Sequence, residues 1–259
     1  MNENPTLKGM KALIVGVANE RSLGWSIAKQ LHQAGVKLGF TYIGEKSKDR
    51  LIPMFKALDS DFIEPCDVSQ DHQIAEVFQK LKKKWNTLDI LIHSVAFTNR
   101  EDLQGRFINI PRQSFQTALD ISTYSLIALT HHAEPLFSQT GASIITLSYY
   151  GSQKVIPCYH TMGVAKAALE ASVRYLAYDL GPQKIRVNAI SAGPVKTLSA
   201  RALKDFNAML SLAAEKSPLQ ENIQAEDVGQ LATFLCSPAA KHITGSTIYL
   251  DSGAHIMGV

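Results

Sequence analysis

Two residues that could carry chemistry, Tyr159 and Lys166, lie seven positions apart in a segment with helical spacing of apolar residues. Because an α-helix has about 3.6 residues per turn, this spacing places both side chains on one helix face, two turns apart. A protonated phenol can donate a hydrogen bond to a developing oxyanion, and an ammonium can hold a polar ligand. Alone, each residue would fit a structural role, as a packed aromatic or a solvated charge. Together, after the apolar run that leads to Tyr149, they predict a catalytic pocket.

The first apolar run of the chain leads into a glycine-containing loop that could bind a phosphate. Gly16 ends this run, and Gly24 follows where a helical pattern begins. A glycine at such a junction lets the backbone approach a pyrophosphate, and the free N–H groups of the helix start attract anions. The spacing is not the G-x-G-x-x-G fingerprint, and a glycine after a strand is often only a tight turn. Its place at the start of an alternating α/β chain favours dinucleotide binding.

About seven short runs of β-branched and apolar residues predict the strands that would position these groups. They are Ala12 to Val15, Val36 to Tyr42, Phe62 to Cys66, Leu88 to Ser94, Ser143 to Ser148, Ile185 to Ile190 and Thr247 to Leu250. Amphipathic helical segments alternate with them. One runs from Trp25 to Ala34 and ends at Gly35, and another carries the stripe Met162, Ala165, Leu169, Leu176 and Leu180. The alternation predicts an α/β, Rossmann-type doubly wound fold with a mainly seven-stranded parallel sheet and a ligand site at its carboxyl edge.

The composition excludes several other classes of protein. With 259 residues and 46% apolar side chains, the chain is expected to form a single domain, residues 1–259. The net charge is only +3, and Lys82 to Lys84 fit a solvated helix end, so no nucleic-acid partner is indicated. Cys66, Cys158 and Cys236 are far apart, which indicates neither disulfides nor a metal site and fits a cytoplasmic location. A polar start and the lack of an apolar run near the roughly 20 residues of a membrane helix predict an unsecreted protein with no membrane partner.

One stretch, residues 196–220, differs from the rest of the chain. It contains helix-forming residues without a strong apolar face and ends close to Ser217-Pro218. Two interpretations stay open for it: a substrate-binding lid over the sheet edge, or a pair of surface helices.

Several motifs, in their order and spacing, resemble the divergent branch of the short-chain dehydrogenase/reductases, the bacterial enoyl-acyl carrier protein reductases. That branch spaces its tyrosine and lysine as Tyr-x6-Lys, as here, whereas the carbonyl-reducing branch uses Tyr-x3-Lys, and Gly163 occupies that lysine position. The other matching motifs span essentially the whole chain: Gly16-Val17-Ala18, Cys66-Asp67-Val68, His93-Ser94, Asp120-Ile121-Ser122, Thr146-Leu147-Ser148-Tyr149, Met162-Gly163 and Arg186 to Pro194.

The chain departs from this family's pattern at two places. The first helix begins with Ser22-Leu23-Gly24-Trp25-Ser26, where the family usually has Ser-Ile-Ala-x-Gly, so the approach of the cofactor can differ slightly there. Cys158 and His160 flank Tyr159 at positions where asparagine is common. Both are interpreted as pocket neighbours without chemical roles.

The resemblance implies an enzyme that uses NADH to reduce the enoyl thioester carried by acyl carrier protein, the last reductive step of the bacterial fatty-acid elongation cycle. Hydride would reach the β-carbon while Tyr159 stabilises the enolate oxygen and Lys166 holds the nicotinamide ribose. The α-carbon would take its proton from Tyr159 or from water. The implied catalytic residues are Tyr149, Tyr159 and Lys166, and no metal is implied. The implied cofactor-binding residues are Gly16, Ser22, Leu23, Ile43, Asp67, Val68, Ser94, Val95, Ala96, Leu147, Lys166, Ala192, Gly193, Pro194, Val195, Thr197 and Leu198. The implied substrate-binding residues are Phe97, Thr98, Tyr149, Tyr159, Met162, Ala200 and Phe206.

Cofactor choice and assembly are also expected from the sequence. NADH is expected over NADPH because Glu45, just after the second strand, would repel a 2′-phosphate, although Lys46 and Lys48 act in the opposite direction. A homotetramer is expected because Ser114 to Phe137 and Tyr159 to Leu180 carry more apolar residues than one sheet face requires, and the family pairs these helices between subunits.

Two alternative functions compete with this interpretation. A ketone or alcohol dehydrogenase of the same fold is favoured by fold analogy alone and opposed by the missing Tyr-x3-Lys. A non-catalytic, nucleotide-binding regulator is opposed by the joint presence of Tyr149, Tyr159 and Lys166.

Overall fold

Buried, apolar strands form the centre of the molecule. The structure is a computed structural model that describes residues 7–196 and 206–258, with side chains from residue 210 onward in the second range. Seven strands pair in parallel in the order β3-β2-β1-β4-β5-β6-β7. Their bounds are β1 Lys11–Val15, β2 Lys37–Tyr42, β3 Phe62–Pro65, β4 Ile90–His93, β5 Ala142–Ser148, β6 Ile185–Ala192 and β7 Thr247–Leu250. The predicted fold class is confirmed.

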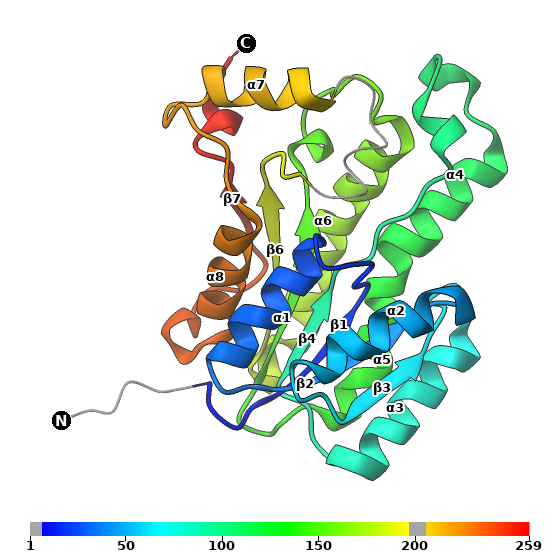
Figure 1. Cartoon of the computed structure of the whole chain (residues 1–259), viewed down its shortest axis with the longest axis vertical. Helices are drawn as coiled ribbons and strands as arrows, with labels where there is room; N and C mark the ends of the chain where they lie inside the picture. The colour runs from blue at the N-terminus through cyan, green and yellow to red at the C-terminus, as the bar shows by residue number, and fades with distance from the viewer. Residues whose placement is uncertain (1–6, 197–205, 259) are drawn as a thin grey trace.

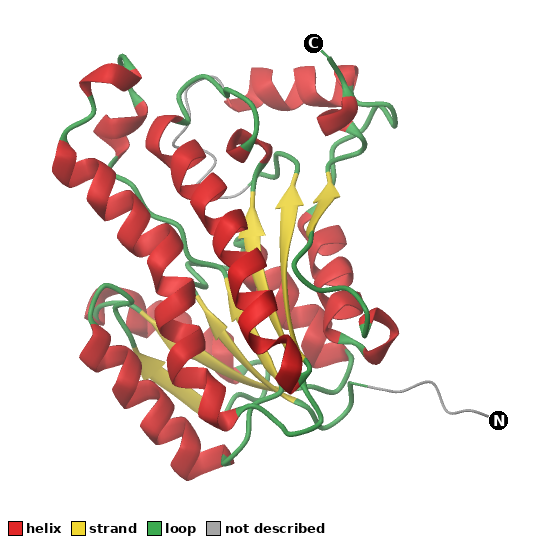
Figure 2. Cartoon of the chain, turned by 180° about the vertical axis from the view of Figure 1, so that it is seen from behind, coloured by secondary structure: helices red, strands yellow, loops and turns green. Residues whose placement is uncertain are grey.

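Helices cover both faces of the sheet, which explains why the strands read as nearly continuous apolar runs. In β1, Leu13 and Val15 pack into one cluster of buried side chains, whereas Ala12 and Ile14 pack into the other. Figures 1 and 2 show the two helical layers from opposite sides. The first cluster is completed by α3 (Asp71–Trp85), α5 (Ser125–Ala133) and α6 (His160–Leu180), and the second by α1 (Leu23–Gln33), α2 (Glu45–Lys56) and α8 (Ala225–Cys236).

Shorter elements connect the layers. Helix α4 (Arg112–Leu119) continues through a π-helical turn, η3 (Asp120–Tyr124), into α5. Such π-helical turns are frequent at functional sites. The 3₁₀ helices are η1 Arg100–Leu103, η2 Phe107–Asn109, η4 Glu134–Leu136, η5 Tyr150–Ser152, η6 Gly181–Gln183, η8 Pro238–Ala240 and η9 Ala254–Ile256.

The end of α1 shows why one predicted strand boundary shifts. Gly35 adopts a left-handed φ of 80°, which a glycine tolerates without a Cβ clash. Its N–H donates to the His32 carbonyl, and the N–H of Val36 donates to the Leu31 carbonyl, the two bonds of a Schellman motif. Val36, expected as the first strand residue, therefore closes the helix, and β2 begins at Lys37.

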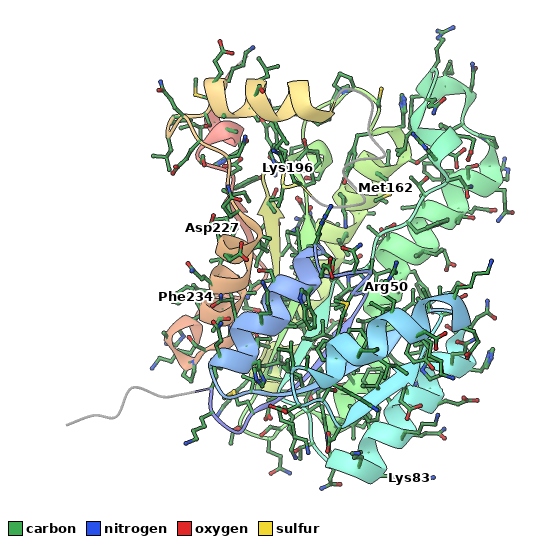
Figure 3. The ribbon with its side chains drawn as sticks, viewed as in Figure 1. Arg50, Lys83, Met162, Lys196, Asp227 and Phe234 are labelled. Atoms are coloured by element: carbon green, nitrogen blue, oxygen red, sulfur yellow. The ribbon has the colours of Figure 1, made fainter. Side chains whose placement is uncertain are left out.

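The predicted lid or helix pair, residues 196–220, is described only in part, because residues 197–205 lie outside the described residues. From Phe206 to Lys216 the chain forms α7, which runs across the molecule beyond the carboxyl ends of β6 and β7 (Figure 1). At the opposite end, Lys82 to Lys84 are exposed in the last turn of α3, and Lys83 projects away from the molecule (Figure 3). Within the described ranges, no helix is long and apolar enough to cross a membrane.

Candidate active site

The two tyrosines and the lysine that the sequence singles out come together beside the carboxyl end of β5. Tyr149 directly follows this strand, Tyr159 is the residue before the first turn of α6, and Lys166 lies two turns along that helix. The ring centroids of Tyr149 and Tyr159 are 5.0 Å apart in an edge-to-face arrangement. The Lys166 Nζ donates to the Leu147 carbonyl at 2.7 Å, which ties the helix to the end of the strand. The end of β5 and the first two turns of α6 are therefore held side by side.

A glycine makes room for this arrangement. A Cβ at Gly151 would lie 2.5 Å from the Tyr159 ring, closer than real Cβ atoms approach their neighbours. A side chain at position 151 would therefore push the Tyr159 ring out of the place it occupies beside Tyr149.

Burial controls the protonation of these groups. It raises the pKa of Tyr159, with the neighbouring Tyr149 adding to the effect, and it also raises the pKa of Tyr149. Both phenols are therefore hydrogen-bond donors at neutral pH. Burial lowers the pKa of Lys166 to about 8, and the negative charge of Glu170 opposes that change. The lysine is thus a cation at neutral pH that deprotonates far more readily than a surface lysine.

The glycine-containing loop lies at the switch point of the sheet, between β1 and β4, where ligands of open α/β sheets bind. Gly16 has a φ of 98°, and a Cβ there would lie 2.3 Å from the Ser94 carbonyl oxygen. A Cβ at Gly24 would lie only 2.9 Å from the Ser94 Oγ. These two glycines let the loop and the start of α1 close onto the end of β4.

The start of α1 is left open for an anion. Ser22 precedes the first helical residue, but its side chain does not cap the helix, because its hydroxyl donates to the Asn19 carbonyl at 2.7 Å. The amides of the first turn, at Leu23 and Gly24, therefore receive no side-chain acceptor from Ser22. A pyrophosphate fits this environment, since helix starts bind anions through such N–H groups.

The other predicted cofactor residues gather at the same sheet edge. Ile43 follows β2, Asp67 and Val68 come after β3, and Val95 and Ala96 follow β4. Asp67 is held in place by its neighbours: its N–H donates to Gln73 Oε1 and its carboxylate accepts from the Ser69 hydroxyl. Leu147 and Ala192 lie in the ends of β5 and β6, and Gly193, Pro194 and Val195 follow β6. Thr197 and Leu198 fall outside the described residues.

The predicted substrate residues are brought together in part. Thr98 Oγ1 is 3.4 Å from Thr161 Oγ1 on α6, so the loop after β4 contacts the helix that carries the lysine. The backbone N–H and carbonyl of Phe97 both hydrogen-bond to Ser122 Oγ, at 3.0 and 3.1 Å. Met162 and Lys196 both lie toward the carboxyl end of the strands (Figure 3). Ala200 is outside the described residues, and Phe206 begins α7, without a described side chain.

Sequence reasoning gave no site role to three residues that support the site, although Ser122 lies in one of the matched motifs. Ser122 and Thr123, in the π-helical turn, hold the Phe97 backbone and, through a 2.8 Å bond, the Ala165 carbonyl. Glu170 is buried one turn after Lys166. The available signal was a carboxylate on the apolar face of a helical stripe, where an acidic residue needs partners.

His93, in one of the matched motifs, has a structural role. Its side chain is fully buried, with Nδ1 2.8 Å from Thr146 Oγ1 and Nε2 2.8 Å from Ser125 Oγ. Burial, together with the charge of Lys166, lowers its pKa to about 3. A histidine that stays neutral at physiological pH, with both ring nitrogens bonded, joins β4 to β5 and α5.

The backbone on both sides of Tyr159 is strained. Cys158 and His160 have φ values of 61° and 35°, in the region that favours glycine and asparagine. The strain is stored next to the phenol, as is common at functional sites.

This strain predicts that Cys158→Asn stabilises the protein by about 1 kcal/mol, since asparagine tolerates the left-handed backbone better than cysteine. Thermal or urea unfolding would measure the gain. Cys158→Ala is the matched control, because it removes the thiol and keeps the strain. Equal stabilisation by both variants would show that the thiol, rather than the backbone, is responsible.

A doubly wound parallel sheet, with a glycine-containing loop at its switch point and a tyrosine–lysine pair at the same carboxyl edge, is typical of the class of dinucleotide-dependent oxidoreductases. A family model described as "Enoyl-(Acyl carrier protein) reductase" matches residues 16–255. The chain therefore belongs to the enoyl-(acyl carrier protein) reductase family, which confirms the resemblance seen in its motifs.

Individual relatives agree with this assignment. The enoyl-[acyl-carrier-protein] reductase [NADH] FabI of Aquifex aeolicus is 47% identical over 253 residues, covering 98% of this chain and 94% of the relative. The reductase of Anaplasma phagocytophilum, solved in complex with NAD, superposes with a TM-score of 0.93 at 43% identity, covering 100% of this chain and 96% of the other. The Bacillus cereus reductase, solved with NADP+ and indole naphthyridinone, has a TM-score of 0.96 at 44% identity, covering 98% and 100%.

Proposed function

We propose that this protein is an NADH-dependent enoyl-[acyl-carrier-protein] reductase of the cytoplasm. It reduces a trans-2-enoyl thioester on acyl carrier protein in the last reductive step of bacterial fatty-acid elongation. The observation that carries the proposal is the placement of Tyr159, just before α6, and Lys166, two turns into it, with Tyr149 at the carboxyl edge of the sheet that also carries the dinucleotide loop. The relatives named above carry this activity in their names.

The residues of the site fit the cofactor and divide the work. The amides at the start of α1 would bind the pyrophosphate, and Lys166 would bind the nicotinamide-ribose hydroxyls. When bound, NADH supplies the hydride that reaches the β-carbon of the substrate. Tyr159 donates its hydroxyl hydrogen bond to the thioester carbonyl oxygen, where negative charge develops, and its raised pKa keeps the proton in place. Tyr149 packs against the Tyr159 ring and closes the acyl side of the pocket.

One absorbance assay tests this function against its alternatives. The enzyme should oxidise NADH when crotonyl thioester is added, which is followed as the loss of NADH absorbance. Oxidation with acetoacetyl thioester but not with crotonyl thioester would identify a ketone reductase. Tight NADH binding without turnover of either substrate would identify a nucleotide-binding regulator.

The surroundings of β2 predict the choice between the two cofactors. Glu45 is exposed at the start of α2, 3.1 Å from Lys48, so this lysine is already paired. Arg50 is also engaged, because its guanidinium donates to the Ala18 carbonyl in the dinucleotide loop. We expect kcat/KM to be higher with NADH than with NADPH by about tenfold, which corresponds to about 1.4 kcal/mol of repulsion. Steady-state kinetics with both cofactors measures this ratio.

The same experiment on two variants isolates the carboxylate. Glu45→Lys should narrow the difference in kcat/KM between NADH and NADPH. Asp49→Lys is the matched control, because it makes the same charge change one turn further along α2. Equal or better use of NADPH by the unmodified protein would contradict the preference.

A homotetramer is supported by apolar side chains that the chain itself leaves uncovered. Tyr175 and Tyr178 on α6 are 75% and 81% exposed, and Tyr124 and Ile127 are exposed near α5. Patches of this kind mark protein interfaces. Light scattering at micromolar concentration should give four times the chain mass, and Tyr175→Glu/Tyr178→Glu should lower it. A monomeric mass for the unmodified protein would contradict the assembly.

A further inference from the structure

A carboxylate lies in the apolar face of α6, behind the reactive groups. Glu170 is 6% exposed and comes four residues after Lys166, so the two side chains lie one turn apart on the same face of the helix. A buried carboxylate is unfavourable unless hydrogen bonds or a positive charge compensate for its lost hydration. The partners of Glu170 therefore reveal its role.

Two serine hydroxyls donate to the same oxygen of this carboxylate. Ser148 Oγ lies 2.5 Å and Ser152 Oγ 2.7 Å from Glu170 Oε1. Ser148 is the last residue of β5, directly before Tyr149, and Ser152 ends η5, three residues after it. The Ser152 N–H also donates to the Tyr149 carbonyl at 2.9 Å. The carboxylate thus holds the backbone on both sides of Tyr149.

The same helix face also holds the end of β5 through the lysine. The Lys166 Nζ bonds to the Leu147 carbonyl, one residue before the serine that binds Glu170. A negative charge one turn away favours the protonated form of the lysine and so raises its pKa against the effect of burial. Lys166 and Glu170 therefore act on one short segment, residues 147–152.

We propose that Glu170 is a positioning residue of the reductase site, which fixes Tyr149 through Ser148 and Ser152 and maintains the positive charge of Lys166. This inference rests on the proposed function, because that function places Tyr149 beside the substrate and Lys166 on the cofactor. Glu170 itself touches neither reacting group.

Four titratable groups that interact with this pair or with each other beside it are neutral near pH 7. They are His93 from β4, Tyr149 after β5, Tyr159 before α6 and Tyr249 on β7, and Tyr249 also interacts with Tyr150 and with the carboxylate of Asp251. The pKa of His93 is lowered to about 3, and burial raises the pKa of each of the three tyrosines. Among the groups that act on Lys166 itself, only Glu170 bears a charge that balances it.

The charge is tested with Glu170→Gln, whose amide oxygen can accept the same two serine hydroxyls. Losing the negative charge lowers the pKa of Lys166, so its ammonium is lost at a lower pH. We measure the Kd for NADH by fluorescence titration and compare Glu170→Gln with the unmodified protein at the same pH. The Kd should stay within about twofold of the unmodified value at pH 6.5 and should be about five- to tenfold higher at pH 8.5. Asp179→Asn is the matched control, because it removes an exposed carboxylate from the same helix.

The hydrogen bonds are tested with Ser152→Ala, which keeps the charge of Glu170 and its bond to Ser148. Hydrogen exchange in the cofactor-free protein should become faster at the amides of Ser152 and Gln153, which bond to the carbonyls of Tyr149 and Tyr150. The kcat/KM for crotonyl thioester should fall about tenfold, as expected for one lost hydrogen bond to a charged group. The pH dependence of NADH binding should not change.

Three results would overturn the proposal. The first is a Glu170→Gln protein that matches Asp179→Asn in NADH affinity at both pH values. The second is unchanged exchange and kcat/KM in Ser152→Ala, which decides the question even if Glu170→Gln does not fold. The third is a loss in both variants that simply follows their melting temperatures. NADH affinity and exchange need no turnover, so they remain readable if the unmodified protein fails to reduce crotonyl thioester and the proposed function is rejected.

Discussion

Replacing Tyr159 with phenylalanine is expected to lower kcat on the order of 10²–10³-fold, the effect of removing one oxyanion donor from a preorganised site. The ring stays, so its edge-to-face contact with Tyr149 is retained. The hydroxyl acts on charge that develops only in the transition state, so the Kd for NADH should stay within about twofold. Turnover of crotonyl thioester and fluorescence titration of NADH measure the two effects.

Tyr150→Phe is the matched control for this loss. The Tyr150 hydroxyl donates to the His255 carbonyl at 3.0 Å, a structural bond beside the same turn. Its removal should lower the free energy of unfolding by about 1 kcal/mol and leave kcat unchanged. A Tyr159→Phe enzyme that keeps full kcat but loses NADH affinity would remove Tyr159 from the role of oxyanion donor.

Lys166→Ala should produce the second large effect, on both binding and turnover. The ammonium is proposed to hold the ribose in the ground state and the transition state alike, so the Kd for NADH and kcat should both deteriorate. Charge-assisted hydrogen bonds contribute about 1.5–3 kcal/mol each, so the Kd should rise about 10- to 100-fold. Lys154→Ala, which removes an exposed ammonium before Tyr159, is the control.

The lysine also gives NADH binding a pH dependence with a defined sign. Burial lowers the pKa of Lys166 to about 8, so the ammonium is present below that pH and is lost above it. In the unmodified protein, NADH affinity should therefore be greatest below pH 8 and fall as the pH rises. In Lys166→Ala this decline should disappear. A decline of equal size in the variant would assign the pH dependence to another group.

The sequence alone predicted the class of fold and the central pair of the site, because both depend on local periodicity. Runs of apolar residues that alternate with amphipathic stripes predict strands and helices without knowledge of their neighbours. A spacing of seven residues, close to two helical turns, places Tyr159, just before α6, two turns from Lys166. Gly35 likewise predicted the end of α1, because a glycine adopts the left-handed φ found just after a helix without a Cβ clash.

The tertiary structure decided what depends on contacts between distant parts of the chain. The order of the strands, with β1 beside β4, brings Ser94 over Gly16 at the switch point of the sheet. The bond between Ser148 and Glu170 spans 22 positions and exists only because α6 packs against β5. The sequence distance between the two residues of each pair follows no helical or strand period, because it is set by the length of the crossover between strands. The residues that bear the chemistry could therefore be recognised from the chain, whereas the partners of the carboxylate behind them required the packed structure.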